Sequence, residues 1–140
     1  VLSRMLCEFN RILLTGSSKA CLSNTRIRTY PRGLDIEIFD FSALELAHKE
    51  AELGFEREHV TPYMYQHPDK FLLHDFKSDE DLSAYRWTLD TPEDLDFIAA
   101  IYSELYKEGQ IVSAEEVLCL LRAKPELCEL NAHVRQKNIK

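Results

Sequence analysis

The stretch RWTLDTPEDLDF, residues 86 to 97, joins a short apolar run to the start of a helix. The run YRWTL, residues 85 to 89, is rich in aromatic and aliphatic side chains and predicts a strand. Thr91 then caps a helix whose first position is held by Pro92 and whose first turn is acidic. These features account for the helix start without Asp90, which lies between the strand and the helix and needs another explanation.

Strand-like and helix-like segments alternate along the rest of the chain. The expected strands are RILLTG (11–16), LDIEIF (34–39), FLLHDF (71–76) and YRWTL (85–89). The expected helices begin at a capping box of Ser42 and Glu45, at Glu56, at Thr91, at a second capping box of Ser113 and Glu116, and at Pro125; Gly54, Pro68 and Gly109 end the first three. The polar, basic segment 17–33 is expected to be a loop. This order predicts an α/β layered fold with a mostly parallel sheet covered by helices.

The composition is typical of one ordinary globular domain covering residues 1–140. Apolar residues make up 45% of the chain and charged residues 29%. The formal net charge of −7 argues against nonspecific nucleic-acid binding, and we expect no nucleic-acid partner. The polar residues 132–140 are expected to form a flexible tail.

The cysteines and the amino-terminal segment indicate the cellular compartment in which the protein is expected. The four cysteines include no CxxC pair, which predicts reduced thiols and neither a zinc site nor a disulfide framework. The apolar segment 1–14 is interrupted by charged and polar residues too often for a signal peptide or a membrane span. We therefore expect a cytoplasmic protein that does not contact a membrane.

Asp90 is a candidate metal ligand because of its predicted position. In α/β sheets, ligands bind beyond the carboxyl ends of the strands, which is where the pattern predicts Asp90. Magnesium takes one or two protein carboxylates and completes its shell with water and phosphate oxygens. The alternative is an acidic residue that only favours the amino end of a helix.

Three arginines, Arg26, Arg28 and Arg32, lie close together in the segment 17–33. Guanidinium groups bind carboxylates and phosphates in bidentate fashion, so the cluster could hold an anionic ligand. A solvated basic loop is the alternative. Asp35 and Glu37 follow on one face of the expected strand, where they could pair with these arginines, bind sugar hydroxyls or serve as surface charge.

Histidines give no independent indication of a catalytic site. His59 lies one helical turn before Tyr63, whereas the other four histidines are scattered along the chain. A packed or surface histidine is the alternative to a catalytic one, because no partner is in evidence. The sequence contains no nucleophile with its base, no glycine-rich phosphate loop and no zinc motif.

Three stretches in order resemble the cytidylyltransferase family of spore coat polysaccharide biosynthesis proteins. This family is related to the enzymes that activate sialic acid and 3-deoxy-manno-octulosonic acid with CTP. The stretches are SNTRIRTYPRGLDIEIF (23–39), EREHVTPYMYQHPDKF (56–71) and RWTLDTPEDLDFIAAIY (86–102). Their order and spacing are similar to those in the carboxyl half of the family, over residues 23–108.

The resemblance implies a Rossmann-like nucleotide-diphospho-sugar transferase fold. It also implies transfer of CMP from CTP to a sugar hydroxyl with release of pyrophosphate, and magnesium as the cofactor. Asp90 would be a catalytic residue and a magnesium ligand near the α-phosphate. The implied substrate-binding residues are Arg28, Arg32 and Asp35 in the acceptor sugar site, with Glu58 and His59 on its rim. An exposed helical arm used for pairing is part of the resemblance, so a homodimer is a further expectation.

The sequence departs from the family at two places. The family begins with a strand and a loop that hold the CTP triphosphate, and no such segment precedes Val1. A second metal-binding aspartate is missing between Gly16 and Cys21. We therefore expect the carboxyl half of such an enzyme, without its nucleotide-binding part and with little or no activity alone. The alternatives are a noncatalytic dimerisation or regulatory remnant of the fold, and a nucleotidyltransferase for another base or sugar.

Overall fold

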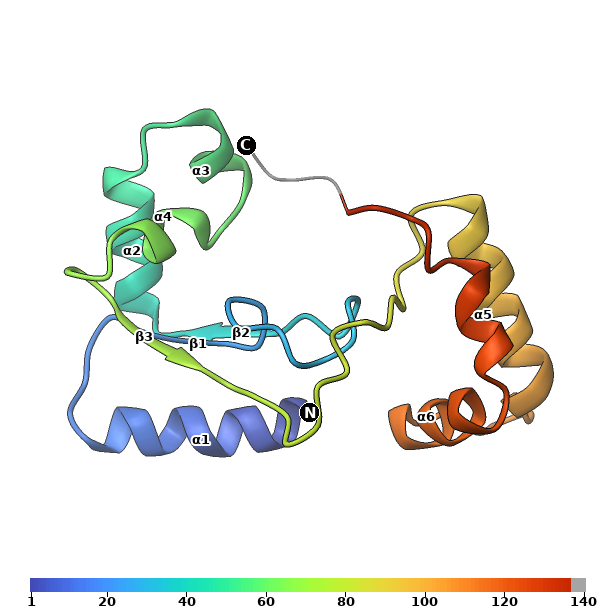
Figure 1. Cartoon of the computed structure of the whole chain (residues 1–140). Coiled ribbons are helices and arrows are strands. Elements are labelled where there is room, and N and C mark those ends of the chain that lie inside the picture. Colours follow the sequence, from blue (N-terminus) through green and yellow to red (C-terminus); the bar gives the residue numbers. More distant parts are fainter. Residues whose placement is uncertain (137–140) are drawn as a thin grey trace. The chain divides into compact units, whose positions relative to one another are not determined.

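The computed structural model describes residues 1–136 (Figure 1). The chain divides into two compact units. Unit 1 contains strands and helices, and unit 2 contains helices. Unit 1 comprises Val1–Tyr30 and Asp35–Asp81, and unit 2 comprises Pro31–Leu34 and residues 82–136 of the described chain. The expectation of one domain over residues 1–140 stays a prediction.

A three-stranded sheet forms the centre of unit 1. The strands are β1 (Ala20–Ser23), β2 (Glu37–Phe39) and β3 (Leu72–Asp75), in the order β2-β1-β3. β1 pairs with β3 in parallel and with β2 antiparallel. The prediction of a mostly parallel sheet is therefore wrong in this unit, where the described sheet is mixed.

Helix α1 (Leu2–Leu14) packs on one face of this sheet (Figure 1). Its apolar residues Met5, Phe9 and Ile12 recur at helical spacing and bury against Leu22 of β1. The strand predicted over 11–16 is wrong, because residues 11–14 continue the helical period of α1 and residues 15–16 form a turn. The strand is instead β1, a run of four buried residues inside the segment that was expected to be a loop.

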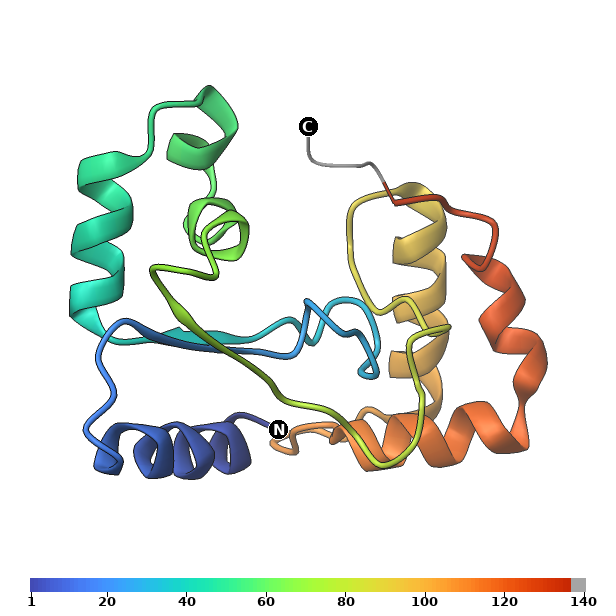
Figure 2. The same ribbon diagram turned by 60° about the vertical axis from the view of Figure 1, so that its left-hand side comes forward.

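Three helices lie on the side of the sheet opposite α1, and the first and third of them pack against it (Figure 2). They are α2 (Phe41–Glu50), α3 (Gly54–Glu58) and α4 (Pro62–Gln66). The prediction of one helix entered at Glu56 is wrong, because residues 59–61 interrupt it and Pro62 begins a new helix. Cys21 of β1 packs among buried residues of α2 and α4.

The N-cap of α2 is Asp40, which corrects the prediction of Ser42. The Asp40 carboxylate accepts the Ala43 N–H at 2.8 Å and the Ser42 hydroxyl at 2.5 Å. It also accepts the Ala20 N–H at 2.7 Å, so the cap joins α2 to β1. Burial opposes ionisation, but these hydrogen bonds outweigh it and lower the pKa of Asp40.

Unit 2 is helical, with α5 (Pro92–Leu105), α6 (Ala114–Ala123) and the 3-10 helix η1 (Pro125–Leu130). The predicted caps are confirmed, since the Thr91 hydroxyl accepts the Asp94 N–H and Ser113 with Glu116 forms a capping box. α5 ends at Leu105, before the predicted Gly109. The helices enclose a core of Phe97, Ile101 and Leu121.

The predicted strand over 85–89 is absent from the described structure, which has only an isolated parallel bridge between Arg32 and Arg86. Gly33 makes this close approach possible. It adopts φ +104°, and a Cβ at this position would lie 2.4 Å from the carbonyl oxygen of Trp87.

The end of the chain is described only in part. Residues 132–136 belong to no helix or strand, and residues 137–140 of the predicted tail lie outside the described residues. Within the described residues, no helix combines the length and the apolar character needed to cross a membrane.

Candidate functional site

A row of three polar residues crosses the sheet of unit 1. Ser23 of β1 pairs in register with Glu37 of β2 and with Asp75 of β3. Directly paired residues share one face of a sheet, so the three side chains form a continuous row. The row lies at the carboxyl ends of the parallel strands β1 and β3, which is the edge where α/β sheets bind ligands.

Glu37 collects hydroxyl donors from three segments. The Thr61 hydroxyl lies 3.0 Å from each of its carboxylate oxygens, and Thr25 donates to Oε1 at 3.3 Å. The hydroxyl of Tyr65 in α4 donates to the same oxygen. Burial, followed by this hydrogen bond to Glu37, raises the pKa of Tyr65, so the phenol remains a neutral donor.

Asp75, at the other end of the row, is paired with Arg26. The Arg26 guanidinium lies 3.6 Å from Asp75 Oδ1 and stacks over the Tyr65 ring at 5.6 Å from its centroid. Asp75 Oδ1 is buried and accepts no hydrogen bond from the described residues. Arg26 therefore connects the two ends of the row through Asp75 and Tyr65.

Arg28 and Asp35, both predicted to bind the acceptor, form an ion pair in unit 1. Arg28 donates to the two carboxylate oxygens at 2.5 and 3.0 Å, so the pair is bidentate. The sequence left several roles open for Asp35, and among them was an ion pair with one of the arginines. The structure contains this ion pair. Arg32 belongs to unit 2, where its main chain exchanges hydrogen bonds with Tyr85 and Trp87.

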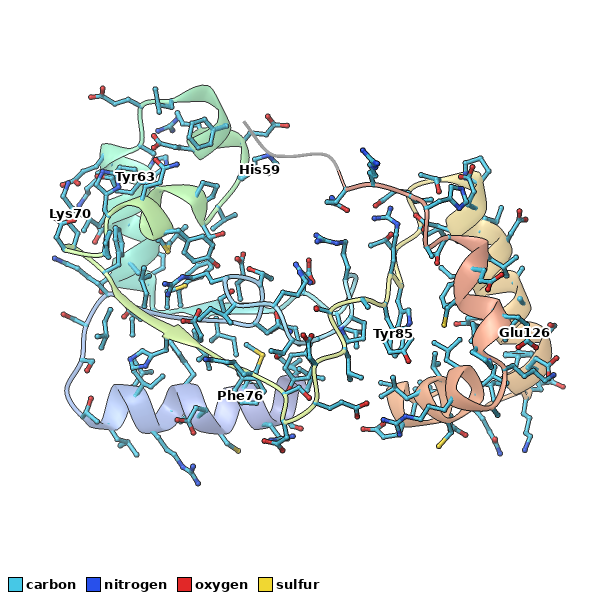
Figure 3. The ribbon with its side chains drawn as sticks, viewed as in Figure 1. His59, Tyr63, Lys70, Phe76, Tyr85 and Glu126 are labelled. Atoms are coloured by element: carbon cyan, nitrogen blue, oxygen red, sulfur yellow. The ribbon has the colours of Figure 1, made fainter. Side chains whose placement is uncertain are left out.

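Glu58 and His59 lie at the end of α3, in unit 1. Glu58 is exposed, whereas His59 is half-buried in the turn before α4 (Figure 3). His59 lines a cavity of 140 Å³ together with His48 and Glu56. Glu56 is the buried acid of this segment, and it accepts the N–H groups of Glu52 and Leu53.

Asp90, the predicted metal ligand, lies on the surface of unit 2. Its side chain is 63% exposed, and its Oδ2 accepts Arg86 Nη2 at 3.1 Å. Among residues 1–136, no group of three or more His, Cys, Asp and Glu side chains is arranged to hold a metal ion. Asp90 by itself is one exposed carboxylate, ion-paired with Arg86, and one carboxylate is the lower limit of the protein ligands that magnesium takes beside phosphate.

Asp94 is the buried acid of this segment, a role that the sequence pattern did not indicate. Arg86 donates to its two oxygens at 2.9 and 2.8 Å, and Thr88 and the Asp90 N–H each donate at 3.0 Å. The Asn131 amide adds a bond of 2.9 Å. The Arg86 hydrogen bonds, which are the largest influence, hold the pKa of Asp94 well below its usual range.

Thr61, Tyr65 and Asp75 were also missed by the sequence analysis. Strand register places Asp75 in the site, and the packing of α4 places Thr61 and Tyr65 there. Both depend on contacts between segments that are far apart in the sequence. The alternating pattern of LDIEIF was the available signal for Glu37, since it placed Glu37 on the face it shares with Asp35.

Comparisons with known proteins give two curated relatives and one solved structure. The chain is 36% identical over 110 residues to an uncharacterised protein of Methanocaldococcus jannaschii, covering 76% of this chain and 44% of that protein. It is 32% identical over 105 residues to the spore coat polysaccharide biosynthesis protein SpsF of Bacillus subtilis, covering 73% of this chain and 43% of SpsF. The chain thus spans less than half the length of these relatives. No family model matches it.

The structure is similar to that of a cytidylyltransferase from Leptospira borgpetersenii serovar Hardjo-bovis. The TM-score is 0.77 and the sequences are 28% identical, with 97% of this chain and 56% of that chain covered. The chain therefore has the α/β fold of a nucleotidyltransferase, which confirms the predicted fold class. The similarity to SpsF and to this structure supports the resemblance to cytidylyltransferases.

Proposed function

We propose that the chain acts as part of a CTP-dependent sugar nucleotidyltransferase. The reaction transfers CMP from CTP to a hydroxyl of an acidic or modified sugar, for a surface or spore coat polysaccharide, and releases pyrophosphate. The observation that carries the proposal is the row of Glu37, Ser23 and Asp75 at the edge where α/β sheets bind their ligands. The similarity to a cytidylyltransferase over 97% of the chain supports the choice of reaction.

The polar row would recognise the hydroxyl groups of the acceptor sugar. Glu37 keeps Thr61 and Tyr65 fixed, so their oxygens are presented to a ligand in one orientation. Arg28 would bind the carboxylate of an acidic sugar, because a guanidinium offers a planar pair of donors. In the free protein, Asp35 occupies these donors, so the sugar carboxylate would exchange with Asp35.

Magnesium and Asp90 form the second part of the proposal. When bound, magnesium neutralises the charge that develops on the transferring phosphoryl group. Asp90 would supply one carboxylate oxygen to the ion. Asp94 would hold the main chain of Asp90 through the Asp90 N–H, while Arg86 pairs with both acids.

Ligand binding tests the two parts separately. We expect a nonulosonic or related sugar acid to bind the chain, and Arg28→Ala to weaken that binding at least tenfold. Arg11→Ala is the matched control, since Arg11 is an exposed surface arginine that pairs with the exposed Glu8. Calorimetric titration with a panel of such sugars measures both effects, and the absence of binding by every acidic sugar would contradict the acceptor assignment.

Asp90 is tested by magnesium binding to the chain itself, measured by calorimetric titration. We expect Asp90→Asn to weaken this binding, whereas Asp69→Asn at another exposed position leaves it unchanged. An assay of pyrophosphate release with CTP and the same sugars then measures turnover, for which we expect little or none from this chain alone. Turnover that Asp90→Asn abolishes would show that the chain is sufficient for catalysis.

The second candidate function is a noncatalytic dimerisation or regulatory remnant of the same fold. β2 and β3 are the edge strands of the described sheet, and open strand edges favour association. A chain that associates but binds neither CTP nor a sugar acid would favour this function over the transferase.

A further inference from the structure

A cavity of 140 Å³ lies in unit 1, between α2, α3 and the turn that follows α3. Its apolar lining consists of Leu44, Ala47 and Ala51 of α2 together with Val60. The two alanines belong to the core, and their short side chains leave the space that a larger residue would fill. Of the described residues, those of the polar row do not line this cavity, so it is separate from the proposed acceptor site. Pockets for drug-sized ligands measure about 300–1,000 Å³, so the cavity suits a smaller molecule.

Glu56 brings a buried carboxylate to this cavity. The residue is 7% exposed, and its Oε2 accepts the N–H groups of Glu52 and Leu53 at 3.2 and 3.1 Å. Both bonds reach the same oxygen, and a carboxylate accepts on both of its oxygens, so Oε1 can accept a further donor. A carboxylate that is removed from water is stabilised by a cationic partner, so an ammonium group is the donor that fits this position.

Arg57, the next residue, brings the opposite charge to the cavity. Its Nη1 donates to the carbonyl oxygens of His48 and Ala51 at 3.2 and 3.1 Å, so the guanidinium is held at the end of α2. A guanidinium carries five N–H donors on three nitrogens, so Arg57 keeps donors that a carboxylate can accept. His48 and His59 also line the cavity, and each imidazole can donate an N–H to the same carboxylate.

We propose that this cavity binds a free α-amino acid with a small apolar side chain. The ammonium group of the ligand pairs with Glu56, its carboxylate pairs with Arg57, and its side chain contacts the apolar lining. A ligand with a single charge would pair with only one of these two residues. A ligand without an apolar part would leave the apolar lining in contact with water. The inference does not depend on the proposed transfer reaction.

An NMR titration of the ¹⁵N-labelled full chain with L-valine tests the inference. We expect saturable amide shifts concentrated in residues 44–60, with a dissociation constant between about 10 μM and about 1 mM, because so small a ligand makes few contacts. Two analogues each remove one charge from the same carbon skeleton. 3-Methylbutanoate lacks the ammonium group and 2-methylpropylamine lacks the carboxylate, so each should bind at least tenfold more weakly than valine.

Two variants test the charged residues. Glu56→Gln keeps an acceptor for the two N–H groups but removes the charge, so it should weaken valine binding at least tenfold without weakening the binding of 3-methylbutanoate. Arg57→Gln should weaken the binding of both ligands. The matched controls are Glu52→Gln and Lys49→Gln, which change exposed charges outside the cavity lining and should leave valine binding unchanged. Circular dichroism shows whether the variants are folded.

Three results would overturn the inference. The first is the absence of saturable shifts at valine concentrations well above the expected range. The second is an equal affinity for valine and 3-methylbutanoate, because Glu56 would then not recognise the ammonium group. The third is a set of shifts centred on β1 and β3, together with loss of valine binding in Arg28→Ala, which would place the ligand in the proposed acceptor site instead of the cavity.

Discussion

Asp94 is expected to be the most costly single residue to replace in unit 2. It is fully buried and neutralises Arg86, whose side chain is only 9% exposed. Asp94→Asn leaves that guanidinium without its main partner, and breaking a buried pair in this way costs about 3–5 kcal/mol. Asp90→Asn is the matched control: Asp90 is an exposed partner of the same arginine, so the loss should be under about 1 kcal/mol. Urea unfolding measures both, and equal losses would contradict the difference in burial.

The contribution of Asp94 should also depend on pH. The folded pKa of Asp94 lies below that of an unfolded aspartate, near 3.9. Its ionised form therefore stabilises the fold fully above about pH 4, and this stabilisation is lost as the pH falls further toward the folded pKa. We expect the difference in unfolding free energy between wild type and Asp94→Asn to be constant from pH 7 to about pH 5 and to shrink below about pH 4. A difference that grows in acid would contradict this sign.

Sequence patterns could identify individual residues only where the interaction is local. The pairing of Arg28 with Asp35 was among the open readings because the two residues are close in the chain. Asp75 and Thr61 join the site through register and helix packing, which no short pattern encodes. Asp94 resembles any acidic residue in the first turn of a helix, so its burial depends on Arg86 and Asn131 folding onto it.

The start of α2 gives a prediction at the scale of the element. Asp40→Ala removes the N-cap bond to Ala43 and also leaves the Ala20 N–H of β1 without its side-chain acceptor. We expect a loss of about 1–3 kcal/mol, because a cap contributes about 1 kcal/mol and an unsatisfied N–H adds to it. Ser42→Ala removes a hydroxyl that donates to Asp40 and accepts the exposed Lys19 N–H at 3.3 Å, but it leaves the bonds of Asp40 to Ala43 and Ala20 in place, so its effect should be smaller. Thermal unfolding compares the loss of stability in the two variants. A larger loss in Ser42→Ala would indicate that Ser42, as predicted from the sequence, is the N-cap.

Helix starts were predictable where the cap is a local Ser or Thr motif, as at two of the helices in this chain. The caps at Thr91 and Ser113 are local chemistry, and both are confirmed. β1 has only four residues, and it is buried because α1 and α2 cover its two faces. The helices that bury β1 are not encoded in its local sequence. The polar residues on either side of β1 therefore led to the prediction of a loop. The segment 85–89 has strand composition but pairs only through one bridge, which composition could not indicate.

At the scale of the whole molecule, each unit has its own hydrophobic core. Unit 1 buries seven residues in the cluster around Cys21 and five in the cluster beneath α1. The core of unit 2 has three buried residues, with partly buried side chains around them. Composition and length predict one domain, and they carry no information on how the apolar residues divide between cores. Stability scales with the amount of buried surface, so the two units are expected to differ.

Two probes report the two units separately within one intact chain. Trp87 is the single tryptophan and packs beside the core of unit 2, so its fluorescence follows that unit. Cys21 is 1% exposed, and burial raises the pKa of its thiol to about 12, so it should react with thiol reagents only when unit 1 opens. We expect the Trp87 transition at a lower urea concentration than the onset of Cys21 labelling, because unit 2 has the smaller core. Cys21→Ser, labelled in parallel, corrects for the other three cysteines. Coincident transitions would instead support one cooperative domain.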